Sequence, residues 1–114
     1  MADSKLTATV RHECEKAIID LVGEINTFAE DTLMEVYNLV ERENTESILL
    51  NFQDVEYINS TGIALIVSLL AQARKAHREI VVYGLSDHYI EIFEITRLSD
   101  FMTITQNESA ALSL

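Results

Sequence analysis

Short apolar runs of strand length alternate along this chain with longer segments in which apolar residues recur at helical spacing. The runs at 47–55 and 79–84 are short and rich in apolar residues, as strands buried on both faces of a sheet are. Segments with helical periodicity lie beside them at 27–43, 63–73 and 88–96. Strands that alternate with helices are joined by βαβ crossovers, so the pattern predicts a largely parallel sheet.

The two ends of the chain complete this α/β pattern. Two β-rich segments, 6–12 and 16–24, are separated by Glu13-Cys14-Glu15, which is the spacing of an antiparallel hairpin. A short strand near 101–105 and a short helix that starts at 107–108 follow the third long helix. The predicted order is β-β-α-β-α-β-α-β-α in one domain of 114 residues, with a mixed, mostly parallel sheet packed by four helices.

Each long helix has an apolar side that we expect to pack on the sheet. The first helix, with Asn26 or Thr27 as its N-cap, carries acidic side chains on its other side. The second helix closes in the basic segment 74–78, which suits the carboxyl end of a helix. The residues expected to point inward are Phe28, Leu33, Val36, Leu39, Val40, Ile63, Ile66, Leu69, Leu70, Ala73, Tyr89, Ile92 and Phe93.

Charge, cysteine content and hydropathy argue against several classes of protein. A formal net charge of −11 opposes nucleic-acid binding, which depends on Lys and Arg, and favours a basic protein partner. Cys14 is the single cysteine, so no intrachain disulfide can form and a reducing compartment, the cytoplasm, is expected. The longest apolar run, 63–73, is shorter than the roughly 20 residues of a membrane span, and the opening residues lack a secretory pattern. We therefore expect no direct membrane insertion.

The sequence contains no recognisable motif of enzymatic chemistry. Phosphate-binding glycine loops, zinc-protease motifs and nucleophile elbows do not occur. His12, His77 and His88 have no Cys or His at metal-binding spacing beside them, and Cys14 lies between two glutamates, which does not favour a nucleophilic thiolate. We predict no catalytic residue, no metal ligand and no cofactor.

The segment Asn59-Ser60-Thr61-Gly62 is the most distinctive polar cluster, because the chain has only three glycines and no proline. Asn or Ser before an apolar helical run is a typical N-cap, whose side-chain oxygen accepts a hydrogen bond from a helix N–H. A hydroxyl at this position is also exposed, and a helix N-terminus tolerates a phosphate. Capping and modification are therefore compatible at this segment.

Two short signatures resemble those of the anti-sigma factor antagonists, single-domain members of the STAS family. They read Gly23-Glu24-Ile25-Asn26 after the second strand and Ile58-Asn59-Ser60-Thr61-Gly62-Ile63 before the second helix. The similarity extends from about residue 6 to about residue 111 and implies a single STAS domain within 1–114.

The resemblance implies partner switching in bacterial transcription control, including stress responses. In such systems the unphosphorylated antagonist binds a kinase-type anti-sigma factor and frees a sigma factor; the kinase then phosphorylates a serine of the antagonist, which releases it, and a PP2C-type phosphatase reverses the modification. The implied phosphoacceptor is Ser60, with Thr61 as the alternative, in a monomer or weak dimer. The implied partner-binding residues are Gly23, Glu24, Ile25, Asn26, Ile58, Asn59, Ser60, Thr61, Gly62, Ile63, Gly84, Leu85 and Ser86.

This chain departs from the family pattern at Asn26 and Asn59, where relatives usually carry aspartate. An amide keeps the capping capacity but removes a carboxylate that would orient a hydroxyl or repel a phosphate. We expect Ser60 to remain phosphorylatable because the kinase supplies the catalytic base. Two alternatives remain: a non-switching STAS subunit of a regulatory scaffold or lipid-transport ABC complex, and a small enzyme of unrecognised chemistry.

Overall fold

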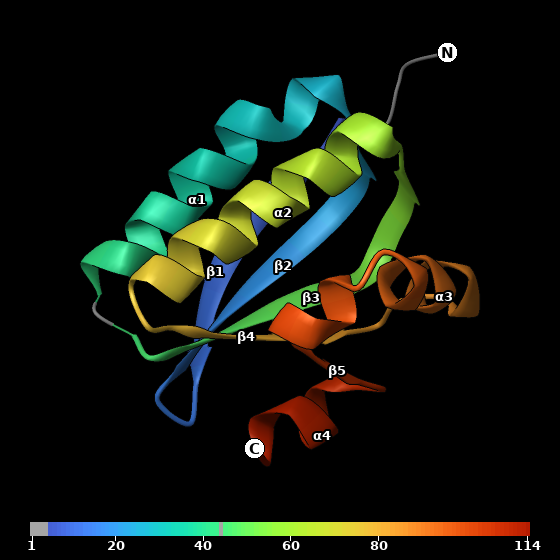
Figure 1. Cartoon of the computed structure of the whole chain (residues 1–114). Coiled ribbons are helices and arrows are strands. Elements are labelled where there is room, and N and C mark those ends of the chain that lie inside the picture. Colours follow the sequence, from blue (N-terminus) through green and yellow to red (C-terminus); the bar gives the residue numbers. More distant parts are fainter. Residues whose placement is uncertain (1–4, 44) are drawn as a thin grey trace.

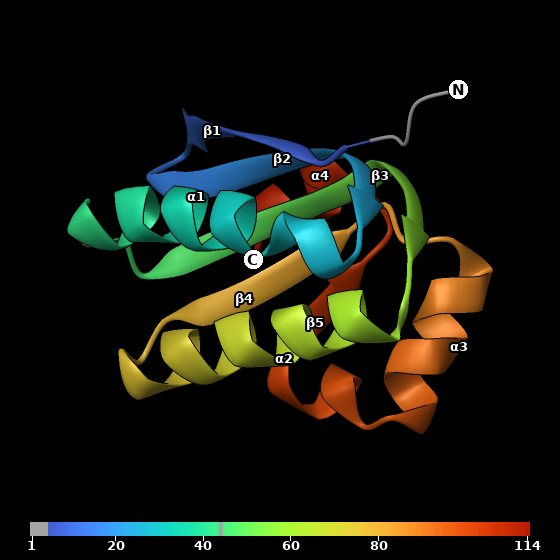
Figure 2. The same cartoon turned by 90° about the horizontal axis from the view of Figure 1, so that it is seen from above.

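The computed structural model describes residues 5–43 and 45–114, which form a five-stranded sheet with helices on both faces (Figures 1 and 2). The strands lie side by side in chain order: β1 (Thr7–Glu13), β2 (Lys16–Ile25), β3 (Ser47–Ile58), β4 (Glu79–Tyr83) and β5 (Thr103–Thr105). The helices are α1 (Glu30–Arg42), α2 (Ser60–Lys75), α3 (Asp87–Ile95) and α4 (Glu108–Leu112), with 3-10 turns η1 (Thr27–Ala29) and η2 (Leu98–Phe101). Because β1 pairs antiparallel with β2 and the other pairs are parallel, the predicted fold class and element order are confirmed.

The sheet separates a large core from a small one. Figure 2 shows α1 and α2 on one face, with α4 on the other. Alternate strand residues such as Ile19 and Leu50 join the larger core, while Ile18 and Leu49 join the smaller core with Ala111 of α4. Side chains of successive strand residues point to opposite faces, so a strand covered on both faces must be apolar at nearly every position. Within the described residues, no helix is both long and apolar enough to cross a membrane.

A polar network attaches α4 to the sheet. Glu108 accepts hydrogen bonds from the guanidinium of Arg11 at 2.6 Å and from the hydroxyl of Tyr83 at 2.7 Å. Arg11 also pairs with Asp20, which accepts a further bond from Asn51 at 2.8 Å. The hydrogen bonds from Arg11 are the largest cause of the lowered pKa values of Asp20 and Glu108, and burial raises the pKa of Tyr83. Both carboxylates are therefore held in their ionised form on this face of the sheet.

Three local expectations need correction. β3 continues to Ile58 instead of ending at residue 55, because its backbone keeps pairing with β2 while its polar side chains face solvent. Phe28 fits the helical spacing of α1, which predicts that it points inward. It is 78% exposed instead, because it lies in η1, before α1 begins. Leu39 is 48% exposed at the edge of the buried stripe of α1, where Tyr37 is fully buried instead.

Candidate functional site

The carboxyl ends of the parallel strands bring the three predicted partner-binding segments to one edge of the sheet. Residues 23–26 close β2, residues 58–63 join β3 to α2, and residues 84–86 join β4 to α3. Figure 1 shows β2 and β3 ending beside the N-terminus of α2. Because β2, β3 and β4 run parallel as neighbours, these segments meet at the edge where open α/β sheets generally bind ligands.

Asn59 begins α2 and links it to the end of β2. Its side-chain oxygen accepts a hydrogen bond from the N–H of Gly62 at 2.8 Å, which is an N-cap. Its own N–H donates to the carbonyl oxygen of Ile25 at 3.2 Å. The predicted cap is therefore present, and it also fixes where the helix starts relative to β2.

Gly62 is required by a close approach of two backbones. A Cβ atom at this position would lie 2.0 Å from the carbonyl oxygen of Ile25 and 3.0 Å from a methyl group of Ile58. Such distances are far below van der Waals contact, so any side chain would push α2 away from β2. The glycine is therefore a packing residue of the site.

Ser60 and Thr61 are the first two residues of α2, and both are exposed. Within the described residues, neither hydroxyl makes a hydrogen bond. The first turn of α2 contains no acidic residue, so apart from the cap that Asn59 provides to Gly62, no negative charge of this turn offsets the positive end of the helix dipole. The structure thus presents two hydroxyls where an added phosphate would be tolerated.

Asn26 uses both halves of its side-chain amide. The oxygen accepts from the N–H of Phe28 at 2.9 Å and caps η1, while the nitrogen donates to the carboxylate of Glu24 at 3.4 Å. An aspartate could cap the turn but would face Glu24 with like charge. The amide at this position therefore has a local structural reason. Asn26 and Phe28 also line a hollow of about 460 Å³ with Lys5 and Leu6.

Gly23 and Gly84 allow the strand ends to bend. Gly23 has a φ of 114° at an irregularity in the β2–β3 pairing, where one residue of β3 is left over between the partners of Gly23 and Glu24. Gly84 has a φ of 83°, and a Cβ there would lie 2.6 Å from the backbone nitrogen of Gln53. Both conformations favour glycine, since other residues rarely adopt them.

Tyr89 joins the third segment to the second, and the sequence pattern indicated only that it would point inward. Its hydroxyl accepts from the N–H of Ile58 at 2.8 Å and donates to the carbonyl oxygen of the same residue at 3.4 Å. Ser86 caps α3 by accepting from the N–H of Tyr89 at 3.4 Å. Tyr89 is half-buried, and a tyrosine hydroxyl that is removed from water usually needs a hydrogen-bond partner. Its place on the inward side of the predicted helix was therefore the one signal of this contact in the sequence. Tyr89 therefore fixes the end of β3 directly before the cap of α2.

The third segment also borders a small hollow at this edge. Its volume is about 120 Å³, and it is lined by Phe52, Gln53, Val55, Ile58, Gly84, Leu85, Ser86 and Tyr89. The predicted residues Leu85 and Ser86 thus lie against the end of β3, while Ser60 and Thr61 are not part of this lining. The site is therefore the exposed surface at the start of α2, and the hollow lies beside it.

Comparisons with known proteins agree with this architecture. A family model described as STAS domain matches residues 5–111. An anti-sigma-B factor antagonist of Staphylococcus aureus (strain NCTC 8325 / PS 47) is 32% identical over 84 residues, which are 74% of this chain and 78% of the relative.

Two solved structures share the fold at low sequence identity. An anti-sigma factor antagonist from Mycobacterium paratuberculosis superposes with a TM-score of 0.84 and 16% identity, covering 98% of this chain and 95% of that one. The Bacillus cell fate determinant SpoIIAA in its phosphorylated form superposes with a TM-score of 0.69 and 17% identity, covering 92% and 96%.

Proposed function

Because this chain belongs to the STAS domain family, we propose that it is an anti-sigma factor antagonist that acts by partner switching. In this proposal the unphosphorylated protein binds a kinase-type anti-sigma factor and frees a sigma factor. Phosphorylation of Ser60 releases it, and a PP2C-type phosphatase restores the binding form. A cytoplasmic location follows, since the freed sigma factor joins RNA polymerase in that compartment.

The observation that carries the proposal is that Ser60 is exposed at the start of α2, and that three contacts fix the position of this helix start. The cap by Asn59, the close approach of Gly62 to Ile25 and the clamp of Tyr89 on Ile58 hold the segment in place. A phosphate there adds about −1.5 to −2 charges and three acceptor oxygens without requiring the fold to change.

The charge of the phosphate explains why modification would release a partner. In the free domain the phosphate is hydrated and stabilised by the N-terminus of α2. In a complex that covers this edge it must be desolvated against the partner surface. A loss of only about 2.7 kcal/mol of binding free energy weakens a complex about a hundredfold.

Phosphorylation is tested by incubating the protein with the kinase-type anti-sigma factor of its source organism and ATP, followed by intact-mass spectrometry. We expect a single phosphate on the wild type and on Thr61→Ala, and none on Ser60→Ala. An unmodified wild type would refute the proposal, and a phosphate that disappears only with Thr61→Ala would move the site by one residue.

Partner release is tested with the same kinase by calorimetry or biolayer interferometry. We expect Ser60→Ala to bind at least as tightly as the wild type and to stay bound in ATP, and Ser60→Asp to bind at least tenfold more weakly. Equal binding of both variants in ATP would instead favour the alternative of a non-switching STAS subunit, in a regulatory scaffold or lipid-transport ABC complex. The amides at Asn26 and Asn59 are the feature that favours this alternative.

A further inference from the structure

Helix α2 and its flanking residues have a charge distribution unlike that of the rest of the chain. Residues 57–78 contain no Asp or Glu, although the chain has 19 acidic residues. Helix α1, in contrast, carries exposed acidic residues in its first turn and along its outer side. The exposed residues of α2 before its basic end are Ser60, Thr61, Ala64, Val67, Ser68 and Ala71. A solvated helix normally carries charges on its outer side, whereas protein interfaces are depleted of them.

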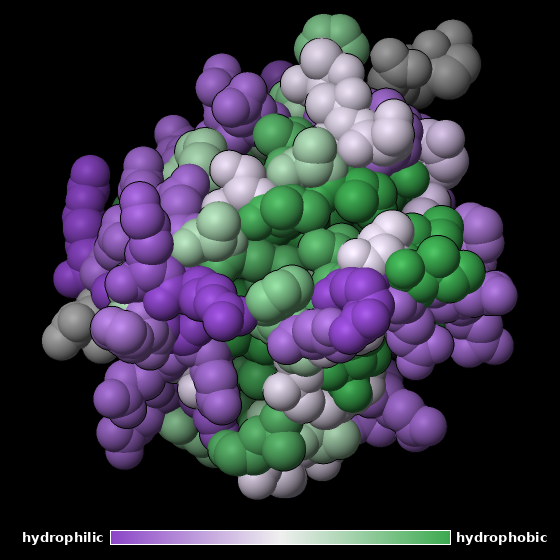
Figure 3. All heavy atoms as spheres, in the orientation of Figure 1, coloured by the Kyte–Doolittle hydropathy of each residue, from purple (hydrophilic) through white to green (hydrophobic). Residues whose placement is uncertain are grey.

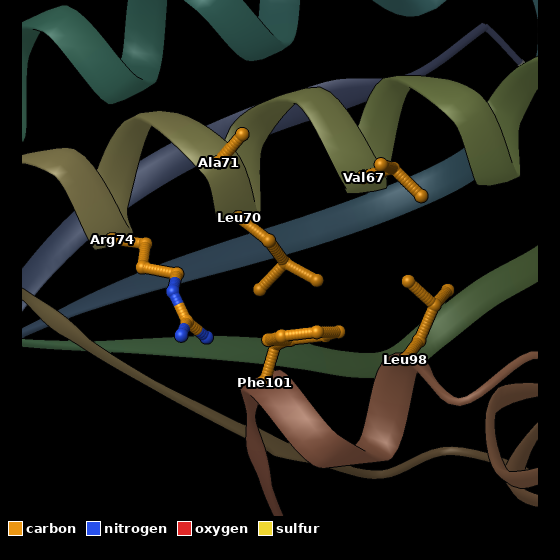
Figure 4. A pocket seen from close by; sticks show the side chains of 6 residues that line it. All are labelled: Val67, Leu70, Ala71, Arg74, Leu98 and Phe101. Atoms are coloured by element: carbon orange, nitrogen blue, oxygen red, sulfur yellow. The ribbon is translucent and has the colours of Figure 1, made fainter.

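An apolar groove lies beside this side of α2. It has a volume of about 220 Å³ and is lined by Val67, Leu70, Ala71, Arg74, Leu98 and Phe101 (Figure 4). In that view Leu70 points from α2 toward the ring of Phe101 on η2, and Leu98 lies at the end nearer Val67. Leu70 and Leu98 are buried, but Val67 is 44% and Phe101 50% exposed. The two large exposed apolar side chains therefore face a cavity that this chain leaves open.

Arg74 closes the other end of the groove with a positive charge. Its guanidinium carbon lies 4.9 Å from the centroid of the Phe101 ring, a cation–π contact that orients it. Within the described residues Arg74 forms no ion pair, whereas the neighbouring Arg78 and Arg97 pair with Glu41 and Asp100. A second, more polar hollow of about 260 Å³ continues past Arg74 and includes Arg78, Glu79 and Asp100. An apolar group with a carboxylate next to it fits this arrangement of apolar lining and uncompensated cation.

The groove is continuous with the site at Ser60. Figure 3 shows apolar residues gathered along the middle of this face, beside the hydrophilic surface over α1. Val67 and Arg74 follow Ser60 by two and four turns of α2, which is about 10 and 21 Å along the axis. A standard interface buries about 800 Å² on each partner, a patch roughly 30 Å across. One partner can therefore cover both Ser60 and the groove.

We propose that this groove is a second docking point for the kinase-type anti-sigma factor, taking a large apolar side chain of that partner while a neighbouring carboxylate of the partner pairs with Arg74. This proposal rests on the proposed function. The two ends of α2 then have different roles: the groove supplies affinity, as a central apolar pocket does in many interfaces, and Ser60 supplies the phosphate-dependent release.

The test compares matched substitutions for binding of the source organism's purified kinase-type anti-sigma factor in calorimetry without ATP. Val67→Asp places a carboxylate in the groove, and Leu39→Asp places one at a similarly exposed apolar position of α1. Arg74→Glu and Arg42→Glu form a second pair at the ends of α2 and α1. We expect Val67→Asp and Arg74→Glu to weaken binding at least about tenfold and the α1 variants to stay within about twofold of the wild type. Circular dichroism establishes that all four variants are folded.

The outcomes separate this proposal from the one on which it rests. If the wild type binds and Ser60→Asp is released, but both groove variants bind as the controls do, the groove proposal is wrong and the proposed function stands. If the wild type does not bind the kinase at all, both proposals are wrong. A titration with decanoate tests a free anionic amphiphile: saturable shifts of the Val67 and Leu70 methyl signals, together with unchanged kinase binding in both groove variants, would assign the groove to a small molecule instead.

Discussion

Replacing Gly62 by alanine tests whether the start of α2 is fixed by contact with β2. The new Cβ would lie 2.0 Å from the carbonyl oxygen and 2.8 Å from the carbonyl carbon of Ile25. These are backbone atoms, so no side-chain rotation can relieve the clash. The first turn of α2 must move by more than an ångström, which breaks the bond from the N–H of Asn59 to Ile25.

The expected change in the free energy of unfolding combines two unfavourable terms and one favourable term. Overpacking of this kind costs about 1–3 kcal/mol, and the lost hydrogen bond costs about 1 kcal/mol. Alanine has the better helix propensity and recovers about 1 kcal/mol. The sterics therefore outweigh the propensity, and we expect Gly62→Ala to lower the free energy of unfolding by about 2 kcal/mol.

Urea unfolding followed by circular dichroism measures this change. For a chain of this size the transition midpoint should fall by roughly 1 M. Thr61→Ala is the control in the same turn, since its exposed side chain makes no contact that fixes the helix, and it should stay within about 0.5 kcal/mol of the wild type. An unchanged or increased stability of Gly62→Ala would mean that propensity governs this position, and the account of a fixed helix start would be wrong.

Substitutions at three further residues test contacts that stabilise the fold and the site. Asn59→Ala should cost about 1 kcal/mol in urea unfolding through loss of the N-cap, whereas Asn59→Asp should be nearly neutral; equal losses would contradict the capping role. Tyr89→Phe should cost about 1–2 kcal/mol by leaving the N–H of Ile58 unpaired, and a faster amide hydrogen exchange at Ile58 is the accompanying signature. Because hydrogen bonds from Arg11 lower the pKa of Asp20, the stability they provide is complete above the ordinary carboxyl pKa of about 4 and is lost as pH falls below it. Arg11→Gln should therefore flatten the acid side of the stability profile, and an unchanged profile would exclude this ion pair as its cause.

The fold was largely predictable because hydrophobic periodicity and element order depend on local sequence. The end of β3 was not, because its last residues are polar and extended only through backbone pairing with β2. Phe28 and Leu39 were wrongly predicted to point inward for a related reason. Both fit the helical spacing of α1, but Phe28 precedes the helix and Leu39 lies at the edge of its buried side. Periodicity indicates which side of an element is buried but not where that side ends.

The site was predictable in part. The cap by Asn59 follows from its place before an apolar helical run, and the resemblance singled out the neighbouring hydroxyls. The reason for Gly62 could not be read from the sequence, because its contact lies with Ile25, 37 positions earlier. The groove was equally hidden, since Val67 and Phe101 come from elements separated by β4 and α3. Contacts between distant segments depend on the sheet order, which no local pattern specifies.

The hollow that Lys5 and Leu6 share with Asn26 and Phe28 has a practical consequence for all of these experiments. Lys5 therefore lies beside η1, next to the face proposed for the kinase. The residues of α4 lie on the opposite face of the sheet, as Figure 2 shows. We therefore expect an affinity tag or surface-immobilisation handle that follows Leu114 to leave the face proposed for the kinase free.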